Sequence, residues 1–255
     1  ISNTGSIVVN SSAGATATGG FLRVDGDLNA ATTITLTAET ELTTTASITA
    51  DTGLVTLTTT DGDAAAPTNI IVGGAIVSGA GITIDGDAAG TGGFVRIDAP
   101  VDAVGLIDID ANTLLETTAL GSLRSSAGAV DLDTAAGDII IGGFVSSGAG
   151  AVTMTVLGSD ITINAAVSSA TDIVIDSDED AALGGFIRIN ATLDAITAAA
   201  GAITLAAETE ITTTADGIIT ANGAIVISNA IDGDATPAGD ANITVGAAVI
   251  SNTGS

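Results

Sequence analysis

The sequence predicts an all-β fold, a parallel β-solenoid, on three observations. Short segments with alternating β-branched residues recur along the whole chain, as in strands with two different faces. Gly, Asn and Asp separate these segments, and they are the residues that turns favour. The unit recurs about every 25 residues, a solenoid spacing, and no unit alone can bury its apolar face.

Ten segments of the form Φ-x-Φ, where Φ is apolar, mark the expected coils, or rungs. They begin at Ile7, Ile34, Val55, Ile82, Ile107, Val130, Val152, Ile173, Ile203 and Ile225. A second element, Φ-(Asp/Asn/Gly)-(Gly/Ala)-x-Φ, follows most of them, at 24–28, 72–76, 97–101, 163–167, 189–193 and 245–249. We interpret its small central residues as corners that need a left-handed backbone. Alternate Ile, Val, Leu and Ala then fill a narrow interior.

The chain also carries a long-range repeat. Residues 1–6 (Ile-Ser-Asn-Thr-Gly-Ser) recur without change as residues 250–255, 249 positions later. We interpret residues 1–249 as one period of a tandem array and residues 250–255 as the start of the next. On this interpretation residues 1–255 form a single solenoid segment without separate domains.

Two other folds are weaker accounts of the pattern. The Ala-rich segment 193–205 suits a helix by propensity, but Gly201 and the neighbouring Thr residues argue against one. A β-sandwich array predicts hairpin turns between pairs of long alternating strands. The Asp-Gly and Asn-Gly dipeptides of this chain do not lie between such pairs.

Composition excludes most chemistry. The 255 residues include 30 Asp and Glu, four Arg and no Lys, His, Cys, Trp or Tyr, giving a formal charge of −26. No thiol, imidazole or Lys Schiff-base chemistry is available, and the carboxylates are spread along the chain, so we predict no enzyme activity and no organic cofactor. The charge argues against nucleic acid and anionic membrane surfaces as partners. No apolar run of about 18 residues exists, so we expect no membrane insertion.

The repeat units resemble those of giant repetitive bacterial surface proteins, the filamentous haemagglutinins and autotransporter passengers. The resemblance rests on the degenerate Gly-x-Ile-x-Leu and Φ-x-Φ-Asn/Asp-Ala-x-Φ units and covers the whole chain. It implies a right-handed parallel β-helix, secretion to the extracellular space or cell surface, and an adhesive or filament-forming role.

The acidic turns are candidate calcium sites, because calcium prefers several carboxylate and carbonyl oxygens in one turn. They are four Asp-Gly-Asp triplets and the acidic run 176–180. The candidate ligands are Asp25, Asp27, Asp61, Asp63, Asp85, Asp87, Asp176, Asp178, Asp180, Asp232 and Asp234. The alternative is a solvated acidic surface that keeps filaments soluble. Alternation also predicts that the Asp pairs 108/110 and 131/133 face outward.

Three Phe-x-Arg elements are candidate interface residues. They are Phe21 with Arg23, Phe94 with Arg96, and Phe186 with Arg188, and each follows Gly-Gly. An Arg cannot lie unpaired in a dry core, so these pairs should point outward. Aromatic and Arg residues are common interface anchors. The alternative is an intrachain bridge to an Asp such as Asp25 or Asp98.

These observations predict a structural repeat unit of an extracellular filament or giant surface adhesin. Such a unit would associate end to end with copies of itself through open β-helix edges. The alternative is an adhesin stalk, a binding module that holds calcium or a surface polysaccharide. Asn-x-Ser/Thr tripeptides at Asn10, Asn190 and Asn242 are candidate glycan acceptors.

Overall fold

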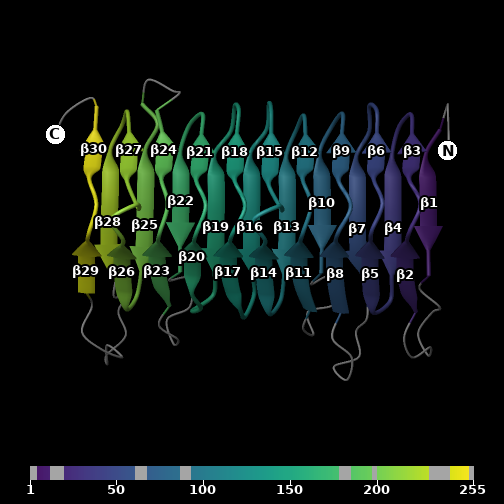
Figure 1. The fold of residues 1–255 in the computed structure, drawn as a ribbon, viewed down its shortest axis with the longest axis horizontal. Coiled ribbons are helices and arrows are strands. Elements are labelled where there is room, and N and C mark those ends of the chain that lie inside the picture. Colours follow the sequence, from purple (N-terminus) through teal and green to yellow (C-terminus); the bar gives the residue numbers. More distant parts are fainter. Residues whose placement is uncertain are drawn as a thin grey trace.

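The chain winds into a parallel β-solenoid whose coils stack along its long axis (Figure 1). The computed structural model describes residues 5–11, 20–60, 68–86, 93–177, 185–196, 200–229 and 242–252. Each coil contributes one strand to each of three parallel ten-stranded sheets, and the described residues contain no helix. The predicted fold class is therefore confirmed. All but the two outermost strands of each sheet have a strand neighbour on both sides.

The sheets are numbered by the order in which a coil enters them. The first sheet contains β1 (Ile7–Asn10), β4 (Ile34–Ala38), β7 (Val55–Thr59), β10 (Ile82–Asp85), β13 (Ile107–Ala111), β16 (Val130–Thr134), β19 (Val152–Val156), β22 (Ile173–Asp176), β25 (Ile203–Ala207) and β28 (Ile225–Asn229). The second contains β2 (Phe21–Val24), β5 (Glu41–Thr44), β8 (Thr68–Val72), β11 (Gly93–Ile97), β14 (Leu114–Thr117), β17 (Asp138–Ile141), β20 (Ile161–Ile163), β23 (Phe186–Ile189), β26 (Glu210–Thr213) and β29 (Asn242–Val245). The third contains β3 (Leu28–Ala30), β6 (Ile48–Ala50), β9 (Ile76–Ser78), β12 (Val101–Ala103), β15 (Leu123–Ser125), β18 (Val145–Ser147), β21 (Val167–Ser169), β24 (Leu193–Ala195), β27 (Ile219–Ala221) and β30 (Val249–Ser251).

The predicted strand starts and corners both correspond to structural positions. All ten Φ-x-Φ starts are the first residues of the strands of the first sheet. The six predicted corner elements each join the end of a second-sheet strand to the start of a third-sheet strand. Equivalent residues stack in register, as in the column of Ile82, Ile107 and Val130. The Ala-rich segment forms β24 and the start of β25, with residues 197–199 outside the described part.

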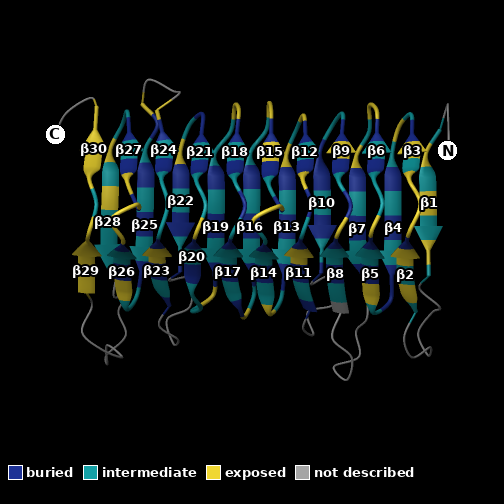
Figure 2. Cartoon of the chain, in the orientation of Figure 1, coloured by how far each residue is buried: buried dark blue, intermediate teal, exposed yellow. Residues whose placement is uncertain are grey.

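Strict alternation along the strands produces the core. In β13, Ile107, Ile109 and Ala111 are buried, whereas Asp108 and Asp110 are only half-buried. The described core contains aliphatic side chains, Met154, and some Ser and Thr, but no aromatic residue. A narrow interior between three sheets explains this choice, because a large ring would force the sheets apart. The inward side chains are buried in the middle coils and more exposed in the end coils (Figure 2).

Buried serines at the end of the third sheet tie successive corners together. The Ser125 hydroxyl donates to the Gly105 carbonyl at 2.6 Å and accepts from the Gly128 amide at 2.8 Å. One coil further on, Ser147 donates to the Gly128 carbonyl at 2.7 Å and accepts from the Gly150 amide at 2.9 Å. These buried hydroxyls are therefore satisfied, and each links its own corner to the preceding coil.

The prediction that corner residues need a left-handed backbone is wrong for the described residues. Gly158, with φ of 66°, is the one described residue with positive φ. The small corner residues are needed for a different reason, the close approach of stacked coils. A Cβ at Gly74 would overlap the backbone of Ala46, and one at Gly143 would overlap that of Gly121.

A core substitution tests the packing. Leu132 in β16 is fully buried near the middle of the solenoid. We expect Leu132→Ala to lower the free energy of unfolding by about 2–5 kcal/mol, since it removes core contacts and leaves a cavity. Ser146→Ala, on the outward face of β18, should change it by less than about 0.5 kcal/mol. Urea unfolding followed by circular dichroism measures both, and equal effects would contradict the inward assignment of Leu132.

Candidate functional site

The first sheet carries a carboxylate ladder, defined as Asp85, Asp108, Asp110, Asp131 and Asp133. The register places Asp110 between Asp85 and Asp133 in one column, and Asp108 beside Asp131 in the next. Adjacent strands are about 4.8 Å apart, so these carboxylates repel one another through a partly desolvated surface. The Asp pairs 108/110 and 131/133 lie on the outward faces of β13 and β16, as predicted.

Burial raises the pKa of three carboxyl groups in the ladder, those of Asp108, Asp110 and Asp131. Desolvation, followed by the charges of Asp108, Asp133, Asp85 and Asp131, raises the pKa of Asp110 to about 7. Desolvation also raises the pKa of Asp108. Desolvation, followed by the charge of Asp108, raises the pKa of Asp131. The ladder can therefore take up a proton near neutral pH.

A cavity of about 380 Å³ lies beside the ladder, lined in part by Asp110, Asp133, Thr155 and Leu157. Within the described ranges, no group of three or more Asp, Glu, His or Cys side chains is arranged to hold a metal ion. The chemistry that this arrangement supports directly is proton uptake.

Four of the predicted calcium ligands lie within the described residues, and two of them, Asp25 and Asp27, share the corner between β2 and β3. Asp25 accepts hydrogen bonds from Arg23 Nε at 2.7 Å and from the Thr45 hydroxyl at 2.8 Å. Asp27 accepts from the hydroxyl and amide of Ser47 at 2.6 and 3.0 Å. Hydrogen bonds from Arg23 and Ser47, respectively, lower the pKa of the two carboxyl groups.

Two further candidate ligands within the described residues lie on other coils. Asp85 belongs to the carboxylate ladder, and Asp176 ends β22, opposite Thr155 of β19. Seven candidates lie outside the described residues: Asp61, Asp63, Asp87, Asp178, Asp180, Asp232 and Asp234. Calcium binding stays a prediction.

The Phe-x-Arg elements all face outward on the second sheet, but on separate strands. They belong to β2, β11 and β23, with two strands between the first pair and three between the second. Phe21 and Arg23 are strongly exposed, whereas Phe94 and Phe186 are half-buried. The structure therefore does not gather the three elements into one patch.

Among the described residues, two of the three arginines form an ion pair with a carboxylate of the same chain. Arg23 Nε lies 2.7 Å from Asp25, and Arg96 Nε lies 2.9 Å from Asp98. Glu116 is at the outer limit of an ion pair with Arg96, at 4.0 Å. The Arg188 guanidinium instead lies over the Phe186 ring, 5.0 Å from its centroid. A role for these residues in contacts between molecules stays a prediction.

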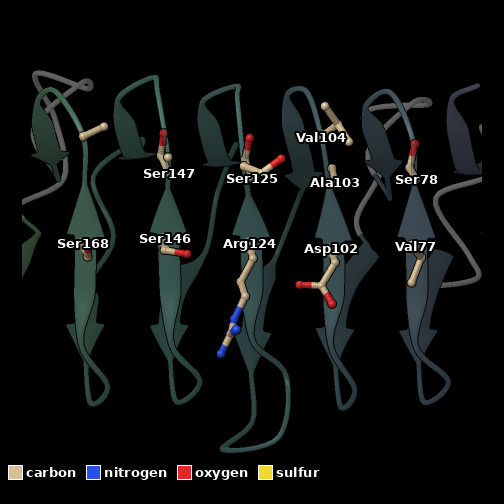
Figure 3. Close-up of a pocket in the computed structure, with 13 residues that line it drawn as sticks. Val77, Ser78, Asp102, Ala103, Val104, Arg124, Ser125, Ser146, Ser147 and Ser168 are labelled. Carbon is tan, nitrogen blue, oxygen red and sulfur yellow. The ribbon is translucent and has the colours of Figure 1, made fainter. Parts of the chain in front are cut away.

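A shallow groove of about 580 Å³ runs across the third sheet (Figure 3). Its floor is a row of outward side chains from successive strands, which are Val77, Asp102, Arg124, Ser146 and Ser168. Arg124 lies between Asp102 and Ser146 in this row, so the side chains at its centre are polar.

Sequence reasoning missed the contact of Arg124 with an aromatic ring. Its guanidinium lies over the ring of Phe144, 5.4 Å from the centroid. A signal was present, because Phe144 belongs to the one Gly-Gly-Phe segment that no Arg follows two residues later. Phe144 and Arg124 are the one Phe and the one Arg that lie outside the Phe-x-Arg pattern.

The candidate glycan acceptors lie at strand ends and corners. Asn10 ends β1, and Asn242 is exposed at the start of β29. Asn190 follows β23 and donates its amide to the Asn164 side chain at 2.8 Å. A glycan at Asn190 would therefore disturb a contact between stacked corners. Glycosylation stays a prediction.

Comparisons with known protein families, with curated proteins and with solved structures gave no match to this chain. A search of the described part of the chain for a helix long and apolar enough to span a membrane found none.

The carboxylate ladder predicts an unusual pH dependence. The folded-state pKa of Asp110, about 7, lies above its ordinary value of 3.8, so folding takes up a proton between these limits. The ionised Asp110 side chain therefore lowers the free energy of unfolding. This effect is fully present above pH 7 and is relieved as the pH falls toward 4. We expect Asp110→Asn to raise the free energy of unfolding at pH 8 by about 1 kcal/mol, allowing for the solvent screening of a half-exposed group.

Chemical denaturation at pH 8 and pH 5 measures this effect, which should be smaller at pH 5. Asp216→Asn is the matched control, because it removes the same charge at an exposed corner outside the ladder. Equal stabilisation by both substitutions would assign the effect to net charge instead of the ladder.

Proposed function

We propose that this chain is a structural repeat unit of an extracellular filament or giant surface adhesin. Its role is to provide length and stiffness by associating end to end with copies of itself. On this proposal, residues 1–249 are one period of a tandem array, and the molecule acts outside the cell or on its surface.

The observation that carries the proposal is the exposed apolar cross-section at the C-terminal coil. Ile243 is 47% exposed, whereas Ile211, directly beneath it in the same column, is fully buried. Among the described residues no strand pairs with the outer edges of β28, β29 and β30, and Figure 2 shows this end as exposed. An edge that presents unpaired backbone groups and apolar side chains recruits another strand.

Composition supports a mechanical role. The chain lacks His, Cys and Lys, the usual sources of nucleophiles and bases near neutral pH, and its surface repeats along three sheets. A formal charge of −26 keeps long assemblies apart in solution through mutual repulsion.

Electron imaging of unfixed filaments tests the proposal. Ten stacked strands at about 4.8 Å predict an axial repeat of about 48 Å, with strong layering at about 4.8 Å along the axis. Filaments with these spacings are the expected result. Discrete particles without an axial repeat, at every protein concentration tried, would overturn the proposal.

A second candidate function, binding of a surface polysaccharide, is favoured by the groove on the third sheet. Arg124, Asp102 and the neighbouring serines offer the hydrogen-bond donors and acceptors that hydroxyl-rich ligands use. A chain that stays monomeric but loses glycan binding on Arg124→Gln would support this function over the structural one.

The Phe-x-Arg elements predict lateral contacts between filaments. We expect the triple substitution of Arg23, Arg96 and Arg188 by Gln to reduce side-by-side bundling, since each Arg offers a cation to a neighbouring acidic molecule. Arg124→Gln is the control, because it removes an Arg from a different sheet. Bundle width in electron images is the readout, and unchanged bundling in the triple variant would remove this role.

A further inference from the structure

The last described strand of the chain, β30, belongs to the third sheet, and the first, β1, belongs to the first sheet. Each coil runs through the first, second and third sheets, and β30 completes the third-sheet strand of the last coil. The corner that leads from the third sheet back to the first has three or four residues in eight of nine cases. Residues 252–255 supply four, and the repeated hexapeptide that they complete ends immediately before Ile7, the first residue of β1. One period of 249 residues therefore closes a whole number of coils.

The two ends also match in the direction that side chains face. Ile225 and Ile227 of β28 are half-buried continuations of fully buried columns, and Ile7 and Val9 of β1 begin the same columns. In the third sheet, Val249 is 40% exposed above the buried Ile219, and Leu28 begins that column. Each inward position at one end thus has an inward counterpart at the other.

We propose that two copies of this chain stack head to tail, with β28, β29 and β30 of one copy pairing in parallel with β1, β2 and β3 of the next. The register places Ile225 opposite Ile7, Ile243 opposite Leu22, and Val249 opposite Leu28 of the second copy. This inference rests on the proposed structural function and specifies its interface.

Outward residues at the two ends support the second copy as the occupant. Val8 is 70% exposed and Val226 is 48% exposed, and both belong to one column of the first sheet. The proposed register places them side by side, so that two exposed valines form a cross-strand pair. Between the ends, that column is mostly polar, with Thr35, Thr56, Thr83, Asp108, Asp131, Thr153, Val174 and Thr204.

The charge of the described strands at the two ends favours this contact. The chain carries a formal charge of −26, yet the described residues of the last coil, 225–229 and 242–252, include no charged side chain. The second-sheet strand of the first coil presents Arg23. The described strands of the last coil therefore place no carboxylate opposite one of a second copy, a contact that would cost about 1 kcal/mol per close pair in water.

Cysteine cross-linking tests the register directly, because the natural chain contains no Cys. Val8→Cys protein is mixed with Val226→Cys protein and oxidised with diamide. In the proposed register the two Cα atoms lie about 4.8 Å apart, within the range that a disulfide bridges. We expect a disulfide-linked dimer in the mixture and none in either protein alone.

The control shifts the position by two residues on the same face. In a mixture of Val8→Cys with Ser228→Cys the Cα separation is about 8 Å, beyond disulfide reach. The in-register mixture should therefore form on the order of tenfold more dimer. Equal yields would overturn the register, and dimers of either single protein alone would replace head-to-tail stacking with a symmetric contact.

The remaining outcomes separate this inference from the proposed function. Filaments that give no dimer between positions 8 and 226 would overturn the interface while leaving the filament role in place. A chain that is monomeric at every concentration, with no cross-link, would overturn both.

The repeated hexapeptide provides a second variant. Residues 1–6 and 250–255 are identical, so two abutting copies contain the hexapeptide twice where a continuous array contains it once. A variant that begins at Ile7 contains one period without this duplication, and we expect it to associate more tightly in sedimentation experiments. Weaker association than that of the full chain would show that the duplicated hexapeptide contributes to the contact.

Discussion

The structure depends on one constraint, the in-register parallel pairing of each strand with its counterpart one coil away. A shift of one residue would turn every inward side chain outward, so all coils must keep the same phase. Differences in coil length must therefore be absorbed at corners. The longest connections fall between the first and second sheets, such as residues 230–241 between β28 and β29, and leave the pairing of the three sheets intact.

Much of this arrangement was readable from the sequence, because alternation and stacking use the same residues. The Φ-x-Φ starts identified every strand of the first sheet, and the small-residue elements identified the corners between the second and third sheets. The reason given for the corner glycines was wrong, because strand alternation carries no information on how closely one corner approaches the next. That distance depends on stacking, as at Gly74 against Ala46.

The candidate sites were less predictable than the fold. Alternation placed Asp108 and Asp110 on an outward face, but coil lengths vary, so the sequence could not show that Asp85 and Asp133 flank Asp110. The contact of Arg124 with Phe144 has the same origin, since it joins residues 20 positions apart that stacking alone brings together. Local pairs such as Arg23 with Asp25 were accessible, because two residues along a strand share a face.

The direction of the backbone hydrogen bonds determines how this molecule responds to force. In a solenoid these bonds run along the long axis, so axial tension loads the bonds of all three sheets at one junction together. Only one covalent strand of chain crosses each junction. If one coil detaches, its roughly 25 residues extend to about 80 Å, where the folded coil had occupied about 4.8 Å. A stretched array would therefore lengthen in steps of one coil and dissipate load without breaking a covalent bond.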